Sequence, residues 1–363
     1  MTRSVVLHGH FYQPPREEPW LELVPRERSA APHHDWNERI TAECYAPLTG
    51  TPVLDDAGRV RAVYNAYAWC SFDAGPTLLR WFDAHAPAVG AAIVAGDVAA
   101  RTRLGHGNAI AAPYHHIILP LASRRDKVTE VRWGIRDFQR RFGRDPIGMW
   151  LPETAVDDET LEVVAQEGIR FTILAPHQVS HPAPFGRPAR WRGTEGRELA
   201  VFTYDGPISH EVAFSEVMRH GDAWARRFTD APASDDGGPT IISLVTDGET
   251  FGHHHKDGDR ALATLIDRLS HSDRLVVTNF AALLAAHAPT DDITLNQPTS
   301  WSCAHGVERW RSDCGCRMDP GSSQAWRVPL RTGLEIVKEG IHAVVEREWP
   351  REAGDLWVAR EAE

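Results

Sequence analysis

The sequence predicts an α/β fold in which a mainly parallel sheet, closed or nearly closed into a barrel, is covered by helices. Apolar runs rich in β-branched residues alternate with helical patterns through most of the chain, as in parallel strands joined by crossover helices. Roughly seven such units come before residue 290, close to the number that a barrel requires. Two of the runs end in carboxylates, at the strand end where α/β folds usually place their chemistry.

The expected strands are short apolar segments bounded by turn residues. They cover residues 4–7, 61–64, 146–153, 170–174, 199–204, 241–247 and 275–278. The stretch 105–111 is expected to be a loop that enters a short buried segment. The stretch 182–198, rich in Pro, Arg and Gly, is expected to form a hairpin or another excursion.

The expected helices carry apolar side chains at spacings of three and four, which form one buried stripe. The clearest stripe consists of Val128, Val131, Ile135, Phe138 and Phe142. Asp157 is expected to cap the helix that follows it, and Gly168 to end that helix. The predicted helices cover residues 36–45, 76–83, 87–103, 124–142, 157–167, 214–228, 258–270, 280–286 and 323–348.

Two parts of the chain differ in character. Residues 1–290 are expected to form the catalytic barrel, and residues 291–363 an aromatic loop at the site followed by a helical segment that packs on the barrel. The sequence stops within a charged, helix-compatible stretch. We therefore expect the 363 residues to be part of a longer chain.

The composition excludes several classes of function. With 39 Lys and Arg against 50 Asp and Glu, the net charge is −11, so a general affinity for nucleic acid or anionic membranes is not expected. No apolar run approaches the roughly 18 residues that span a bilayer. The five cysteines are an odd number, which indicates a reduced, cytoplasmic setting rather than a disulfide framework.

Glu153 and Asp247 are the candidate catalytic pair, because each follows a separate expected strand and could face the other across the barrel mouth. Two carboxylates so placed suit cleavage of a glycosidic bond, one as nucleophile or base and the other as proton donor. The alternative is that both are structural and cap helices. Glu249, two residues after Asp247, is expected to support the loop and to belong to the substrate-binding residues.

Histidines form a second candidate group. His8 and His10 alternate along the first strand and so could face the same side. They could bind a sugar, be satisfied by backbone groups, or bind a metal such as Zn²⁺ with Asp247 or His106. At most two residues of the triplet 253–255 can face one site, and His253 is the one that we expect to contact the substrate.

Three cysteines and a histidine near the C-terminus form a third group: Cys303, His305, Cys314 and Cys316. They could make a Cys₃His zinc site, although one residue between Cys314 and Cys316 is fewer than the usual two to four. The alternative is thiols that are simply buried or partly exposed. The sequence leaves the role of this group open.

Five stretches together resemble glycoside hydrolase family 57, and they occur in the family's order across residues 4–310. They are 8–14 (His-Gly-His-Phe-Tyr-Gln-Pro), 105–108 (Gly-His-Gly-Asn), 150–153 (Trp-Leu-Pro-Glu), 247–252 (Asp-Gly-Glu-Thr-Phe-Gly) and the aromatic segment 301–310. The resemblance is closest to a branch whose members often carry a further C-terminal domain of unknown function.

The resemblance implies a distorted (β/α)₇ barrel with a C-terminal helical extension, and a retaining mechanism on α-linked glucans. It implies that Glu153 is the nucleophile and Asp247 the general acid/base, and that catalysis needs no metal or other cofactor. The residues that it implies for sugar binding are His8, His10, Gln13 and His106, with Trp150 and Trp301 as stacking surfaces.

The leading hypothesis is therefore a retaining glycosidase or 4-α-glucanotransferase whose partner is an oligo- or polysaccharide. A metal-dependent carbohydrate deacetylase is the first alternative, with His8, His10, Asp247 and His253 or His255 as its site. A barrel that binds glycans without turnover is the second. Metal content separates the first alternative from the leading hypothesis, and product formation separates the second.

Overall fold

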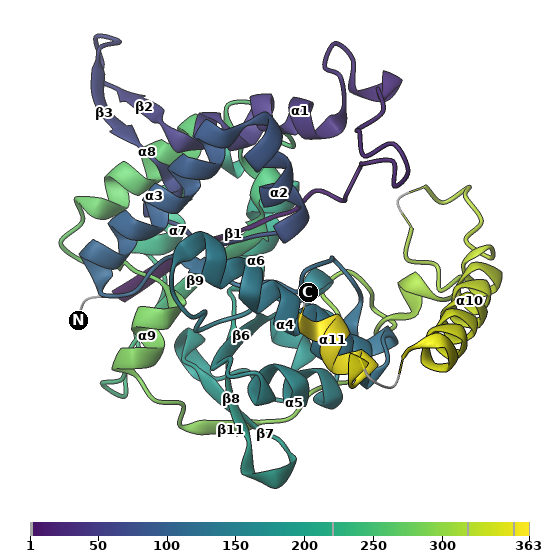
Figure 1. The fold of residues 1–363 in the computed structure, drawn as a ribbon. Helices are drawn as coiled ribbons and strands as arrows, with labels where there is room; N and C mark the ends of the chain where they lie inside the picture. Colours follow the sequence, from purple (N-terminus) through teal and green to yellow (C-terminus); the bar gives the residue numbers. More distant parts are fainter. Residues whose placement is uncertain (1–2, 220, 318, 351–352, 363) are drawn as a thin grey trace.

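The computed structural model describes residues 3–219, 221–317, 319–350 and 353–362. Its centre is a twisted parallel sheet, with helices packed around it (Figure 1). Strands β1 (Arg3–Phe11), β4 (Ser71–Ala74), β5 (Ala109–Ile110) and β9 (Ile241–Asp247) belong to one sheet, in which β1 lies between β9 and β4. Strand β10 (Leu275–Val277) pairs with the first residues of β1.

A second group of strands continues the same curvature. Strands β6 (Phe171–Leu174) and β8 (Glu198–Thr203) are parallel neighbours. Parallel bridges join residue 111 to residue 149, and residue 148 to residue 171, so the segment 148–150 lies between β5 and β6. On the far side, the backbone N–H of Asp205 donates to the carbonyl of Ser243 at 2.9 Å and joins the end of β8 to β9.

These links close a ring of seven parallel segments in the order β1, β4, β5, 148–150, β6, β8 and β9. The ring is distorted because two of its joints are isolated bridges and one is a single hydrogen bond. Its architecture is the (β/α)₇ type that the sequence predicted.

The helices form the outer layer. The longer ones are α2 (Pro76–His85), α3 (Pro87–Leu104), α4 (Arg124–Phe142), α5 (Asp158–Gln166), α6 (Gly206–Phe214), α7 (Gly221–Thr229), α8 (Gly258–Ser270) and α10 (Arg327–Glu348). The shorter ones are α1 (Trp36–Ile40), which continues into a π-helical turn over Thr41–Tyr45, α9 (Phe280–Ala286) and α11 (Leu356–Ala362). Asp157 caps α5 as predicted, because its side chain accepts from the backbone N–H of Thr160.

Most predicted elements are present, but three predictions are wrong. The predicted strand 61–64 is β3 (Val60–Tyr64), which forms an antiparallel hairpin with β2 (Thr51–Leu54) outside the barrel. The barrel strand of this region is β4, which the sequence analysis did not predict as a strand. The helix predicted for 214–228 is shorter, α7 over Gly221–Thr229, and α6 over Gly206–Phe214 was not predicted.

The predicted hairpin at 182–198 is confirmed in outline. Strand β7 (Ala189–Arg192) runs antiparallel to β8, and β11 (Asp291–Ile293) adds to β7 on its other edge. This small sheet edge lies below the barrel in Figure 1.

Two apolar cores hold the barrel together. The larger one lies between the sheet and its helices, and the smaller one fills the barrel interior. Phe280 of α9 belongs to the interior core and packs against Phe171 and Phe202, with ring centroids 6.1 and 4.9 Å away. The interior is therefore a packed core, and its open end is the carboxyl end of the strands.

The C-terminal segment leaves the barrel and returns to it. Helix α10 lies to one side, and several of its apolar residues are exposed, among them Leu334, Val337 and Ile341. Helix α11 packs on α4, where Arg360 forms an ion pair with Asp126 at 3.0 Å. Among the described residues, no helix combines the length and the apolar character needed to cross a membrane.

Candidate active site

The register of three neighbouring strands builds the centre of the site. His10 on β1 is paired with Asp73 on β4 and with Asp247 on β9. Residues in register on parallel strands point to the same face of the sheet. The three side chains therefore form one row, at the carboxyl end of the barrel.

His10 carries positive charge in this row. Its Nδ1 lies 2.7 Å from Asp73 Oδ2, and its Nε2 lies 3.1 Å from His116 Nε2. Burial works against the charged imidazole, but the negative charge of Asp73, with those of Asp247 and Glu249, raises the pKa of His10 to about 9. Burial and the His10 charge lower the pKa of His116 to about 3, so neutral His116 accepts a hydrogen bond from cationic His10.

Glu153 is presented by a strained turn. It follows the segment 148–150 and has φ +58°, and Thr154 after it has φ +48°. Such values are uncommon for residues other than glycine and cost on the order of 1–3 kcal/mol each. The turn persists because Gln178 Nε2 donates to the Thr154 carbonyl at 2.8 Å and the Trp301 backbone N–H donates to Thr154 Oγ1 at 2.9 Å.

The Glu153 carboxylate is held by the loop after β11. Its Oε2 accepts from Ser302 Oγ at 2.6 Å and from Trp301 Nε1 at 3.1 Å. The Arg309 guanidinium donates to the Ser302 carbonyl at 2.9 Å and so fixes the loop from behind. Two donors on one oxygen fix the orientation of the Glu153 carboxylate.

Glu153 and Asp247 line the same pocket, which has a volume of about 320 Å³. The other lining residues are His10, Tyr12, Gln13, Trp36, Ile40, His116, Glu249, His253 and His254. The pocket lies over the carboxyl ends of β1 and β9, so the two predicted carboxylates and four of the eight predicted binding residues are brought together.

The second carboxylate, Asp247, has a higher pKa than a free aspartate. Burial raises the pKa of Asp247, and although the His10 charge lowers it, the negative charges of Glu153 and Asp73 raise it further. Burial and the charge of Asp247 raise the pKa of Glu249 to about 7. Burial therefore favours the protonated form of Asp247, which is the form that a proton donor needs.

The Glu249 carboxylate forms hydrogen bonds with the loop after β1 and with Tyr45. It is 8% exposed, its Oε1 accepts from the Tyr12 backbone N–H at 3.2 Å, and the Tyr45 hydroxyl donates to the same oxygen. Gln13 Nε2 in turn donates to the Tyr45 hydroxyl at 3.1 Å. These bonds join the loop after β1 to the loop after β9.

Four residues expected to bind sugar do not line the pocket: His8, His106, Trp150 and Trp301. His8 lies one layer below His10, with its Nδ1 3.1 Å from Ser71 Oγ, and is 1% exposed. Trp150 is fully buried and stacks under His8 and His10, so it offers no open face to a sugar. His106 precedes β5, at the end of the parallel sheet opposite to the site, because its loop leads into the strand rather than out of it.

The histidine triplet is divided by its surroundings. His253 Nδ1 lies 2.5 Å from Glu43 Oε2 and His253 lines the pocket with His254. His255 instead approaches the carbonyl of Ala213, with Nε2 at 3.3 Å. Trp301 contacts the site through Glu153 and packs edge-on against Trp150 at 5.1 Å.

Sequence reasoning missed several site residues: Tyr12, Trp36, Tyr45, Asp73, His116 and Ser302. Asp73 carried a weak signal, because it is the third residue of the four-residue strand β4, which lies just before Gly75 and Pro76. His116 carried none, since it lies in an irregular connection between β5 and α4.

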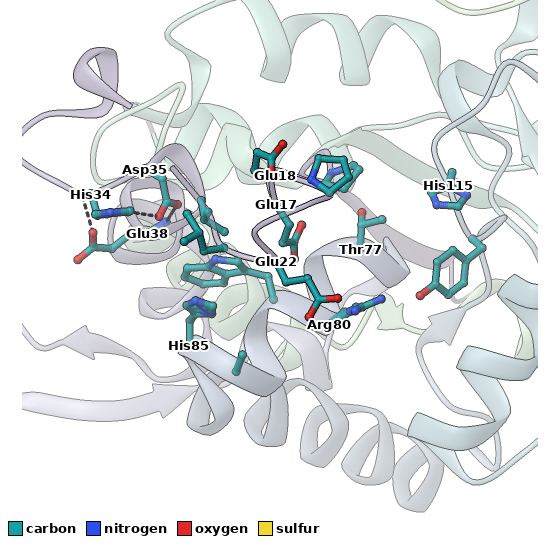
Figure 2. Close-up of a pocket in the computed structure, with 17 residues that line it drawn as sticks. Glu17, Glu18, Glu22, His34, Asp35, Glu38, Thr77, Arg80, His85 and His115 are labelled. Atoms are coloured by element: carbon teal, nitrogen blue, oxygen red, sulfur yellow. Dashed lines mark hydrogen bonds and ion pairs between the residues drawn. The ribbon is translucent and has the colours of Figure 1, made fainter. Parts of the chain in front are cut away.

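A larger cavity of about 920 Å³ lies beside the pocket (Figure 2). It borders the pocket because its Thr77 donates to the carbonyl of Gln13 at 2.8 Å, and its His115 precedes His116. Its wall is acidic, with Glu17, Glu18, Glu22, Asp35 and Glu38. It contains neither Glu153 nor Asp247, so we place the chemistry in the smaller pocket.

The geometry does not favour the metal-dependent alternative. His8 and His10 direct nitrogen atoms to Asp73, and His255 lies outside the pocket lining. Within the described part of the chain, the single group with four potential metal-ligand atoms close together is the cysteine and histidine group near residue 310.

Known proteins resemble this chain in both sequence and fold. α-Amylase 1 of Dictyoglomus thermophilum is 24% identical over 148 residues, which are 39% of this chain and 20% of that protein. A 4-α-glucanotransferase from Thermococcus litoralis superposes with a TM-score of 0.63 and 14% identity, over 87% of this chain and 44% of that one. An exo-type maltose-forming amylase from Pyrococcus sp. ST04 gives 0.69 and 17%, over 92% and 61%.

The chain thus spans less than half the length of the first two of these relatives. At such identities the structural likeness establishes the fold alone. The family assignment rests on the model for glycosyl hydrolase family 57, which matches residues 104–295, more than half of the chain and a range that includes both Glu153 and Asp247. By that match, the protein is a member of glycosyl hydrolase family 57.

Proposed function

We propose that the protein cleaves α-linked glucans with retention of configuration, as a hydrolase or a 4-α-glucanotransferase. The observation that carries the proposal is the convergence of Glu153 and Asp247 in one pocket, where burial raises the pKa of Asp247. The names of the relatives, an α-amylase, a 4-α-glucanotransferase and a maltose-forming amylase, support α-glucans as the substrate class.

In the first step, Glu153 attacks the anomeric carbon as a nucleophile. Trp301 and Ser302 donate hydrogen bonds to its Oε2 and so orient the carboxylate. Asp247 donates its proton to the glycosidic oxygen as the carbon–oxygen bond breaks. The products of this step are a glycosyl ester on Glu153 and the released sugar chain.

In the second step, the Asp247 carboxylate removes a proton from water or from a sugar hydroxyl, and that oxygen displaces Glu153 from the anomeric carbon. Water gives hydrolysis and a sugar gives transfer. The cation of His10 lies in register with Asp247, so it stabilises the carboxylate that forms after proton donation.

We propose Gln13 and His253 as the residues that hydrogen-bond the sugar beside the cleaved bond, since both line the pocket. His10 also lines the pocket, but both of its ring nitrogens face protein partners, Asp73 and His116, so we propose that it acts on the sugar site through its charge. Glu249 is proposed to hold the two loops in place through Tyr12 and Tyr45. The partner is an oligo- or polysaccharide, and the five cysteines, an odd number, favour a cytoplasmic location.

The test compares product formation from maltooligosaccharides by the unchanged protein and by Glu153→Gln and Asp247→Asn. Loss of the nucleophile or of the proton donor should lower turnover by about a thousandfold. Glu348→Gln, at an exposed position on α10, is the matched control and should keep full turnover.

Equal product formation in all of these proteins would refute the assignment. A protein that binds maltooligosaccharides but yields no products at any enzyme concentration would instead be a glycan-binding barrel without turnover.

A further inference from the structure

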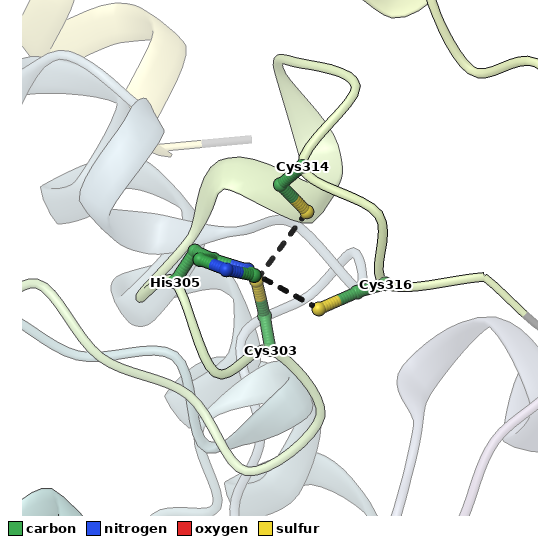
Figure 3. Close-up of side chains that lie close together, drawn as sticks. All are labelled: Cys303, His305, Cys314 and Cys316. Atoms are coloured by element: carbon green, nitrogen blue, oxygen red, sulfur yellow. Dashed lines mark hydrogen bonds between the residues drawn. The ribbon is translucent and has the colours of Figure 1, made fainter.

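Four potential metal ligands converge on the loop between β11 and α10. Cys303, His305, Cys314 and Cys316 each offer one ligand atom, and these atoms all lie within 4.8 Å of one another. Figure 3 shows the four side chains directed toward a common point. No role in the proposed reaction uses them.

Two distances within the group match the edges of a tetrahedral zinc site. Zinc–sulfur bonds of about 2.3 Å and zinc–nitrogen bonds of about 2.0–2.1 Å give tetrahedral edges of about 3.8 Å between two sulfurs and about 3.5 Å between sulfur and nitrogen. The Cys303 and Cys314 sulfurs are 3.9 Å apart, and Cys316 Sγ is 3.5 Å from His305 Nδ1.

The local backbone explains how so short a spacing works. Gly315, between Cys314 and Cys316, has φ +87°, and a Cβ there would meet nothing within 4 Å. That left-handed conformation lets the chain reverse between the two cysteines. On the other side, the Gly306 N–H donates to the Cys303 carbonyl at 3.2 Å and closes a turn around His305.

A disulfide is the competing use of two of these thiols, and it fits less well. A disulfide needs sulfurs about 2.05 Å apart, and all five cysteines of the chain are free. A bond between Cys303 and Cys314 would also leave the approach of Cys316 to His305 unexplained.

We propose that Cys303, His305, Cys314 and Cys316 bind one Zn²⁺ ion in a closed structural site. Three thiolates and an imidazole are the ligands that Zn²⁺ takes in such sites, and four protein ligands leave no position for a substrate or water. The ion is distinct from the catalytic pocket, whose chemistry does not involve it.

The bound ion would also affect the active site, because the zinc ligands directly follow two residues that contact Glu153. Ser302 and Trp301, which hold the Glu153 carboxylate, directly precede Cys303. A metal that ties residues 303–316 together fixes the loop from which these two donors project. This consequence rests on the proposed function, whereas the binding of zinc does not.

The first experiment measures metal in the full chain, purified under reducing conditions with zinc supplied. We expect one equivalent of zinc in the unchanged protein and its loss in a variant with both Cys314→Ser and Cys316→Ser. The buried Cys70 lies outside the group, so Cys70→Ala is the matched control and should retain one equivalent.

Cobalt provides a readout that does not depend on the folding of a variant. Metal-free protein titrated with Co²⁺ should develop thiolate-to-cobalt absorption that saturates at one equivalent and disappears when Zn²⁺ is added. No such absorption, together with no more zinc in the unchanged protein than in the double variant, would overturn the proposal. A disulfide between Cys303 and Cys314 in the reduced preparation would do the same.

Limited proteolysis tests the effect on the loop. Arg309, Arg311 and Arg317 lie within or beside residues 303–316, so trypsin should cut there first once zinc is removed and more slowly once it is restored. Equal cleavage with and without zinc would overturn the loop-fixing role. Zinc binding in a protein that is inactive on every glucan would support this site and refute the proposed function. Activity on glucans in a protein that binds no zinc would refute this site and leave the proposed function in place.

Discussion

At the scale of single residues, His10 carries a positive charge that acts on the carboxylates around it. It is 6% exposed, lies 2.7 Å from Asp73 and is in register with Asp247. Its charge lowers the pKa of Asp247 against the effect of burial. Burial thus favours the protonated Asp247 that donates, whereas the His10 charge favours the carboxylate that remains after donation.

The change His10→Gln tests this role through pH dependence. Asp247 donates only while protonated, so kcat/KM falls as pH rises through its pKa. Without the His10 charge the pKa of Asp247 moves further upward, and the alkaline limb of the kcat/KM profile should shift to higher pH. His253→Gln, at a pocket histidine paired with Glu43, should leave that limb in place. A limb that stays put or moves to lower pH in His10→Gln would contradict the account.

Sequence reasoning reached the residues whose signal is local. Asp247 could be predicted because a buried strand ends directly in it, and Glu153 because an apolar stretch precedes it. Asp73 has the same kind of placement on a strand too short to recognise, four residues in β4. Ser302 and His116 could not be found, because only long-range packing brings their loops to the pocket.

At the scale of elements, α4 packs tightly against the segment that follows β5 and leads to His116 of the pocket. Gly134 lies in α4, and a Cβ there would come within 2.0 Å of the carbonyl oxygen of Ala112. That carbonyl follows β5, so the helix and the sheet approach one another as closely as a glycine allows.

We predict that Gly134→Ala destabilises the protein by about 1–3 kcal/mol, because the helix must move away from the strand. In an open helix the same change should stabilise by about 0.5–1 kcal/mol. Gly340 in α10 has nothing within 4 Å of its Cβ position, so Gly340→Ala is the matched control. Urea unfolding midpoints measure both, and equal stability of the two variants would show that the close approach is not required.

Periodicity predicted the elements best where one face is buried. The limits of α4 agree with the prediction for residues 124–142, because its stripe is regular. Helix α6 was missed and α7 begins later than predicted. Ser215 ends α6 with an extended backbone, φ −128° and ψ 176°, and no change in the apolar pattern marks this position. Strand β1 extends to Phe11, beyond the predicted end at residue 7, since β4 and β9 both pair with its polar end.

At the scale of the whole molecule, the catalytic proposal depends on segments from both ends of the chain. The first strand supplies His10, the middle of the chain Glu153 and Asp247, and residues 301–302 the donors to Glu153. We propose that residues 1–290 are the barrel and residues 291–363 the site loop and its helical extension. The alternation of strands and helices predicted the ring. It did not predict the contact between residues 301–302 and Glu153, which follows the fourth segment of the ring, 148–150.

Trapping the covalent intermediate tests the central claim, that Glu153 is the nucleophile and Asp247 the acid/base. The variant Asp247→Ala is mixed with α-maltotriosyl fluoride, whose leaving group needs little protonation, so the first step proceeds and the second is slowed. Mass spectrometry of the protein and its peptides should find one maltotriosyl group, on the peptide that contains Glu153, and none after Glu153→Gln is added. A label on another residue, or turnover with inverted configuration and no label, would contradict the account.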